Sequence, residues 1–191
     1  MRRDFLIVCM AVVVLAACAG KKDVAPPAPD AKGLLGKRSE EAELLFAKAH
    51  VLWKGDNCAA PQEAVQLLGE ALAKEPDFAA AWAYRGLAYS ELGKRDEAFE
   101  DLTKAVRLDP RAEYYADRGL VSLRAGVLSA ARRDLDYSLK KDHKQHRAWN
   151  ILGETALQEG NAAQACEYYA KGCSNGNCEP LQRARKNGPC K

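Results

Sequence analysis

The chain has few of the residues and patterns that mark an enzyme or a nucleic-acid-binding protein. It has only 3 histidines, His50, His143 and His146, and none of them stands in a metalloprotease pattern. It lacks a glycine-rich phosphate loop, a nucleophile elbow and a paired-carboxylate site. Its formal net charge of +3 is too small to argue for nucleic acid. We therefore expect a binding protein that needs no cofactor, and not an enzyme.

The N-terminal apolar stretch is too short to be a permanent membrane anchor. It runs from Phe5 to Ala17, 13 residues, whereas a helix needs about 20 to cross a bilayer. Arg2 and Arg3 precede it, and small residues follow it ahead of Cys18. A basic start, an apolar middle and a small-residue end together indicate an export signal.

The end of this stretch, Leu15-Ala16-Ala17-Cys18, resembles the lipobox of bacterial lipoproteins. The resemblance implies that residues 1–17 are removed and that Cys18 is lipidated; an ordinary signal peptide cleaved near Ala19 is the alternative. A fully lipidated cysteine is a stable anchor. By the same resemblance Ala19, which is not acidic, favours the periplasmic face of the outer membrane. Residues 18–38 are rich in Ala, Pro, Gly and Lys, which predicts a flexible tether.

A repeat occupies most of the remaining chain. Gly86, Gly119 and Gly153 are separated by 33 and 34 residues, a period typical of stacked supersecondary units. The pattern resembles the tetratricopeptide repeat, and the residues that carry the resemblance are Trp82, Gly86, Tyr89, Ala98, Leu102, Ala105 and Pro110. Four such units cover residues 39–173, and the first needs a connection about four residues longer that contains Asp56-Asn57-Cys58-Ala59.

The fold expected from these units is all-α, an α-solenoid of about four helical hairpins with a short C-terminal capping helix. A lone hairpin leaves an apolar face bare, so stacking supplies the core. Pro76 and Pro110 should end the second helices of their units. Helices are predicted near 39–54, 61–74, 79–92, 95–108, 112–124, 128–140, 146–158 and 162–172, with the cap between Glu179 and Gly188.

Two repeats carry a charged pair where the resembled family more often has an apolar residue. Arg85 and Arg118 precede the repeated glycines, and Asp101 and Asp134 follow 16 residues later. The fourth repeat has Leu152 and Tyr168 at those places. Because charge is present at both positions or at neither, we predict ion pairs within each hairpin, since an unpaired buried arginine would be costly.

Four of the cysteines lie in the last 26 residues, and an exported chain reaches an oxidising compartment. Cys166 and Cys173 share one helix face, and an antiparallel capping helix would bring Cys178 near Cys173 and Cys190 near Cys166. We predict the domain 174–191 to be a cap stapled by Cys173–Cys178 and Cys166–Cys190, although four cysteines allow three pairings. A zinc site is the alternative, but the spacing lacks a Cys-x-x-Cys pair. Cys58 is left either free or linking two copies as a homodimer.

Stacked hairpins of this kind form a concave groove lined by the first helix of each unit, which suits an extended peptide or a helix. The groove is expected to expose Tyr84, Leu87, Asp117, Leu120, Arg124, Arg147, Asn150, Ile151 and Glu154, with Ala80, Ala83, Glu113 and Ala116 beside them. This mixture favours a largely apolar ligand. The set of Lys, Asn and Arg that grips a chaperone's C-terminal carboxylate in related proteins is matched only by Arg147, so that clamp is not expected.

The combination is similar to the lipoproteins that help pilus or secretin assembly. The resemblance implies a membrane-anchored periplasmic adaptor that binds envelope proteins and no nucleic acid. An adaptor for cell-wall hydrolases is a second hypothesis. A third, from another class, makes the cysteine tail a redox or metal-binding device.

Overall fold

The computed structural model describes residues 39–54 and 57–190. The predicted leader, the lipidated Cys18 and the tether lie outside these residues. The described residues form helices joined by short connections and one pair of two-residue strands: α1 Glu40–His50, β1 Trp53–Lys54, β2 Asn57–Cys58, α2 Pro61–Lys74, α3 Ala79–Glu91, α4 Arg95–Leu108, α5 Ala112–Arg124, α6 Leu128–Lys141, α7 His146–Gln158, α8 Ala162–Ser174 and α9 Glu179–Asn187. None of these helices is long and apolar enough to cross a membrane.

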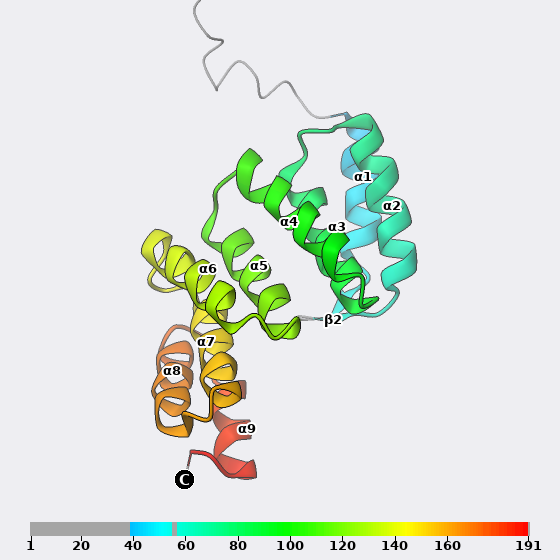
Figure 1. Ribbon diagram of the computed structural model, residues 1–191. Helices are drawn as coiled ribbons and strands as arrows, with labels where there is room; N and C mark the ends of the chain where they lie inside the picture. The colour runs from blue at the N-terminus through cyan, green and yellow to red at the C-terminus, as the bar shows by residue number, and fades with distance from the viewer. Residues whose placement is uncertain (1–38, 55–56, 191) are drawn as a thin grey trace, which may run out of the picture. The chain divides into compact units, whose positions relative to one another are not determined.

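The first eight helices form four antiparallel hairpins, α1/α2, α3/α4, α5/α6 and α7/α8, which follow one another in chain order (Figure 1). In the last three hairpins the turn has a glycine with positive φ, at Gly93, Gly126 and Gly160. A side chain would make that backbone conformation costly, so glycine ends the first helix of each of these three hairpins. The predicted all-α solenoid is confirmed.

The repeated glycine at the middle of α3, α5 and α7 allows the two helices of these hairpins to approach closely. A methyl group added at Gly86 would lie 2.9 Å from the carbonyl oxygen of Ala98 and 2.9 Å from Leu102. At Gly153 it would overlap the ring of Tyr169. The period found in the sequence therefore marks a close helix contact in each of the last three hairpins.

The core consists of four clusters that run through the stack: three join neighbouring hairpins, and the fourth joins the last hairpin to α9. Leu68, Leu102 and Leu135 are fully buried at its centre, one on the second helix of each of the first three hairpins. Small residues such as Ala64, Ala98, Ala131 and Ala165 are also fully buried and keep the helices close. Burying these apolar groups supplies the main stabilisation of the stack.

The first hairpin departs from the predicted pattern at the end of its first helix. α1 ends at His50 instead of continuing to residue 54. Residues 51–60 then connect α1 to α2, and within them β1 and β2 pair antiparallel, with Trp53 opposite Cys58. Val51 and Leu52 are apolar and look helical in sequence, but the backbone N–H of Ala59 donates to the carbonyl of Leu52 and holds the strand pair instead. We call the paired strands β1 and β2, residues 53–54 and 57–58, the insertion hairpin.

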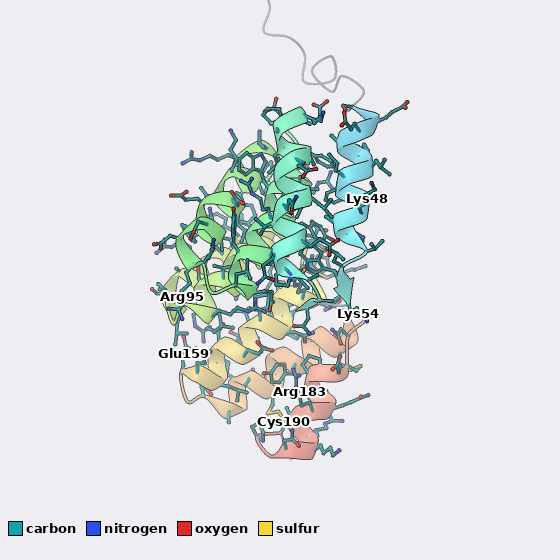
Figure 2. The ribbon with its side chains drawn as sticks, turned by 90° about the vertical axis from the view of Figure 1, so that its right-hand side faces the viewer. Lys48, Lys54, Arg95, Glu159, Arg183 and Cys190 are labelled. Atoms are coloured by element: carbon teal, nitrogen blue, oxygen red, sulfur yellow. A yellow bond between two sulfur atoms is a disulfide. The ribbon has the colours of Figure 1, made fainter. Side chains whose placement is uncertain are left out.

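The C-terminal cap is α9, which packs on α8 through Leu181 and Ala184. Two disulfides join it to the last repeat: Cys166–Cys190, the long-loop disulfide, and Cys173–Cys178, the short-loop disulfide. This is the pairing expected from the antiparallel arrangement. Figure 2 shows Cys190 beyond the end of α9, next to the last repeat.

Candidate functional site

Two hollows open on the face formed by the first helices α1, α3, α5 and α7, which we call the groove face. The first, the tail hollow, has a volume of about 590 Å³ and is bounded by α5, α7, α9 and the insertion hairpin. The second, the aromatic hollow, has a volume of about 560 Å³ and is bounded by α1, β1, α3, α5 and the start of α7. Both fall in the range of 300–1,000 Å³ typical of ligand pockets.

The tail hollow is lined mainly by charged and polar side chains. They are Lys54 and Asn57 of the insertion hairpin, Leu120 and Arg124 of α5, His146, Arg147, Asn150, Ile151 and Glu154 of α7, and Asn177, Glu179, Pro180 and Arg183 at the cap. Arg124 bonds to Glu91 at 2.8 Å, and Arg183 lies 3.8 Å from Glu154. The basic groups of this hollow are thus largely balanced by nearby carboxylates.

The aromatic hollow gathers rings from four elements. Phe46 and His50 come from α1, Trp53 from β1, Tyr84 from α3 and Tyr114 from α5. The rings of Phe46 and Trp53 both stand nearly perpendicular to Tyr84, at centroid distances of 5.5 Å and 4.9 Å. The hydroxyl of Tyr84 lies 3.0 Å from Nε2 of His50. Such edge-to-face contacts fix the rings in place.

The insertion hairpin separates the two hollows. Trp53 packs against both the core of the first two repeats and that of the third and fourth repeats. The next residue, Lys54, lines the tail hollow together with Arg183 of α9, and Figure 2 shows both side chains. The groove face is therefore not one open channel, because a segment of the first repeat lies across it.

The predicted groove residues all line one of these hollows, but five of them are buried instead of exposed. These are Leu87, Asp117, Leu120, Asn150 and Ile151, each with 5 to 8% of its surface accessible. Ala83 and Ala116 are fully buried in the core. The expectation of exposure was wrong because the first helices pack on one another and Trp53 of the insertion hairpin packs against the cluster that contains Leu87 and Leu120. Arg124 stays exposed, and Tyr84, Arg147 and Glu154 are half-buried.

An ion pair joins the third and fourth repeats at the floor of the groove face. Nη1 of Arg147 lies 2.6 Å from Oδ1 of Asp117. Arg147 lines both hollows. Burial raises the pKa of the nearby Tyr84 phenol; the Asp117 carboxylate raises it further, against a smaller opposite effect of Arg147. The phenol therefore stays neutral.

The two ion pairs predicted within hairpins lie away from the groove face. Arg85 donates from Nε and Nη2 to the two carboxylate oxygens of Asp101, at 2.7 and 2.9 Å. Arg118 makes the same contacts with Asp134, at 2.8 and 2.7 Å. These hydrogen bonds raise the pKa of both arginines, and both aspartates are buried. The four residues have a structural position and line neither hollow.

The cysteines offer no metal site in this structure. The four thiols of the tail that a zinc ion would need are paired as disulfides. Across residues 39–54 and 57–190 there is no group of three or more His, Cys, Asp or Glu side chains placed to hold a metal ion. Cys58 is a free thiol on β2, buried in the core of the first two repeats, and burial raises its pKa. Its burial removes it from an intermolecular disulfide in this conformation.

Sequence comparison agrees with the repeat architecture. Two tetratricopeptide-repeat family models match the chain, one at residues 79–111 and the other at residues 116–177. These segments are tetratricopeptide repeats. The preceding hairpin α1/α2 packs on the matched repeats in the same way, through Leu68 and Ala64 in its second helix.

Curated relatives share this repeat over part of their length. The chain is 31% identical over 102 residues to Tetratricopeptide repeat protein 13 of Homo sapiens, and 28% identical over 127 residues to a TPR repeat-containing protein of Methanocaldococcus jannaschii. These matches cover 53% and 66% of this chain but only 12% and 22% of the relatives. The chain thus spans a small part of each relative's length.

Solved structures of tetratricopeptide-repeat proteins have the same fold. The thermophilic TPR protein TTC0263 of Thermus thermophilus has a TM-score of 0.67 at 23% identity, covering 76% of this chain and 79% of its own. PilF of Pseudomonas aeruginosa has a TM-score of 0.59 at 24% identity, covering 72% and 62%. The first TPR of Spaghetti (RPAP3), bound to the HSP90 peptide SRMEEVD, has a TM-score of 0.57 at 23% identity, covering 65% and 99%.

The residues that sequence reasoning missed are those of the insertion hairpin and the cap. Trp53, Lys54 and Arg183 line the hollows although none belongs to a predicted groove position. Phe46 of α1 was also missed. The available signal was Trp53, an aromatic residue beside the longer connection of the first repeat, because a large apolar ring is usually buried against another part of the chain.

Proposed function

We propose that this chain is a lipid-anchored scaffold that binds a segment of an envelope protein on the groove face of its tetratricopeptide repeats. The observation that carries the proposal is the pair of hollows on that face, each lined by side chains from at least three repeats or the cap. Such composite surfaces exist only in the stacked form, which is how repeat proteins build binding sites. The repeat structure bound to an HSP90 peptide supports this use of the fold.

The membrane anchor and the periplasmic location rest on the sequence of the leader. Lipidation of Cys18 would hold the protein at the membrane, and the tether would let the repeats reach a partner. Disulfides in the cap are consistent with an oxidising compartment. The likeness to PilF supports a role in pilus or secretin assembly, whereas an adaptor for cell-wall hydrolases would use the same groove face.

The anchor is tested by labelling cells with an alkyne fatty acid and fractionating their membranes. The wild-type chain should take up the label and sediment with the outer membrane. Cys18→Ser should lose the label and appear in the soluble periplasm. Labelling that persists in Cys18→Ser would exclude lipidation at that residue.

The groove is tested by cross-linking in cells and mass spectrometry of the captured proteins. Lys54→Glu with Arg183→Glu reverses two exposed charges of the tail hollow without touching the core. Lys104→Glu on α4 is the matched control, because it reverses an exposed charge away from both hollows. We expect a specific partner to be lost from the first variant and retained by the control. Equal capture by both would mean that the partner uses another face.

A further inference from the structure

The aromatic hollow has features that the proposed scaffold function alone does not require. The other three hairpins join their helices with the short turns 92–94, 125–127 and 159–161, whereas the first uses residues 51–60. The extra residues place Trp53 against Tyr84. A turn of ordinary length would leave α1 and α3 without this third wall. The insertion hairpin therefore completes a pocket that the repeat by itself does not form.

The electrostatic character of this pocket distinguishes among ligands. Two arginines line it, but each is held by a carboxylate: Arg147 by Asp117 at 2.6 Å, and Arg111 by Asp109 at 2.5 Å. Glu113, which is exposed on α5, forms no ion pair among the described residues, although its carboxylate is near enough to help raise the pKa of Arg111, so the two arginines are faced by three carboxylates. The faces of aromatic rings add negative potential. The pocket thus combines a surplus carboxylate with several π faces.

We propose that the aromatic hollow binds the cationic side chain of a lysine or arginine in the partner's segment. This deepens the groove function and depends on it, since it names the residue type that the groove face recognises. The aliphatic stem of the side chain contacts Phe46 and Trp53, and its charge lies over the rings within reach of Glu113. Cation–π recognition of this kind uses an aromatic cage with a nearby carboxylate.

The alternatives fit less well. An anion would face the surplus carboxylate and the ring faces, and the arginines that could attract it already have partners. An uncharged apolar side chain would leave Glu113 without a function in the hollow. The hydroxyl of Tyr84 lies 3.0 Å from Nε2 of His50, and this contact orients the ring and occupies the hydroxyl, so it is not a binding group for a polar ligand.

The test is fluorine NMR of the purified full chain labelled with fluorotryptophan. The chain has 3 tryptophans. Trp53 lines the hollow, whereas the indoles of Trp82 and Trp149 donate to the carbonyls of Pro76 and His143 and serve as internal controls. The probes are acetylated, amidated pentapeptides of alanine with a central lysine, norleucine or glutamate. Norleucine has the four-carbon stem of lysine and lacks its ammonium group.

We expect the lysine peptide to shift the Trp53 resonance saturably and the other two resonances little. The norleucine peptide should bind about tenfold more weakly, and the glutamate peptide more weakly still. Equal binding of lysine and norleucine, preference for glutamate, or no shift of Trp53 with any peptide would each overturn the proposal.

Two charge-removing variants test the part played by the carboxylate. Glu113→Gln should weaken binding of the lysine peptide about threefold and leave binding of the norleucine peptide unchanged. Glu100→Gln, at an exposed position of α4 outside both hollows, should leave both unchanged. Equal behaviour of the two variants would overturn the role of Glu113. Equal binding of the lysine and norleucine peptides, in a protein whose Lys54→Glu with Arg183→Glu variant still loses the captured partner, would refute this proposal alone. Equal capture by that variant and by Lys104→Glu would instead refute the groove function.

Discussion

Removing one partner of the Arg85–Asp101 ion pair should destabilise the protein far more than removing both. The two hydrogen bonds of the pair are short and bidentate, and Asp101 is only 5% exposed. In Arg85→Leu the buried carboxylate loses its charged partner, which costs about 3 to 5 kcal/mol. Asp101→Tyr should cost about 2 kcal/mol, because the guanidinium keeps some solvent access and its contact with the ring of Trp82 at 4.7 Å.

The double variant should recover most of this loss, and the chain itself indicates why. Its fourth repeat carries Leu152 and Tyr168 where the second carries Arg85 and Asp101. An apolar pair therefore fits the same hairpin geometry, and replacing a buried ion pair by such residues is often neutral. We expect the free energy of unfolding of the double variant, Arg85→Leu with Asp101→Tyr, to lie within about 1 kcal/mol of the wild-type value.

Urea denaturation followed by circular dichroism measures the free energy of unfolding of each variant. Thermal melting should agree, with Arg85→Leu lowering the Tm by about 6 to 12 °C for a loss near 3 kcal/mol. Arg132→Leu is the control, because it breaks a more exposed ion pair with Glu159 and should cost less than about 1 kcal/mol. A double variant whose loss equals the sum of the two single losses would show that the two side chains are not coupled, and the reasoning would fail.

Three further outcomes follow from the same structure. Gly86→Ala should cost about 1 to 3 kcal/mol in urea melts, because its methyl group would lie 2.9 Å from the carbonyl of Ala98, whereas Gly69→Ala, with its nearest atom at 3.8 Å, should be neutral or stabilising. Replacing both cysteines of the long-loop disulfide by serine should lower the free energy of unfolding by about 3 kcal/mol, and the same change at the short-loop disulfide by about 2 kcal/mol. The difference follows from the sequence separations of 24 and 5, because a longer closed loop restricts the unfolded chain more. The reverse order would contradict this loop-entropy explanation. Burial raises the pKa of Tyr169 to about 12. The neutral phenol therefore stabilises the fold below pH 10, and this contribution is lost as pH rises toward 12. Tyr169→Phe should lose less stability than the wild type between pH 10 and pH 12, and identical stability–pH profiles of the two proteins would refute this effect.

Much of the fold could be predicted because the same sequence signals recur in successive repeats. The glycines at the helix crossings, the prolines after the second helices and the apolar period each occur at one spacing, so local and long-range signals agree. The ion pairs could be predicted for a different reason. Comparing Arg85 and Asp101 with Leu152 and Tyr168 inside one chain shows which positions change together.

The sequence predicted which helices form the groove face, but not which of their residues are exposed on it. The first helices were placed correctly, but the burial of Leu87 and Ile151 depends on what lies over them. Part of that cover is Trp53, whose two-residue strand is too short to give a periodic signal. The length of the insertion was visible in the sequence, but its path across the groove face was not, because that path is fixed by contacts with distant repeats.

The two hollows also limit the form of the partner. The tail hollow is bounded by the insertion hairpin and by α9, and the aromatic hollow is bounded by Trp53 of the same hairpin. A long helix lying along the groove face would have to displace Trp53 from two core clusters. An extended segment of a few residues avoids that cost, since it can pass a side chain into each hollow on either side of the insertion hairpin.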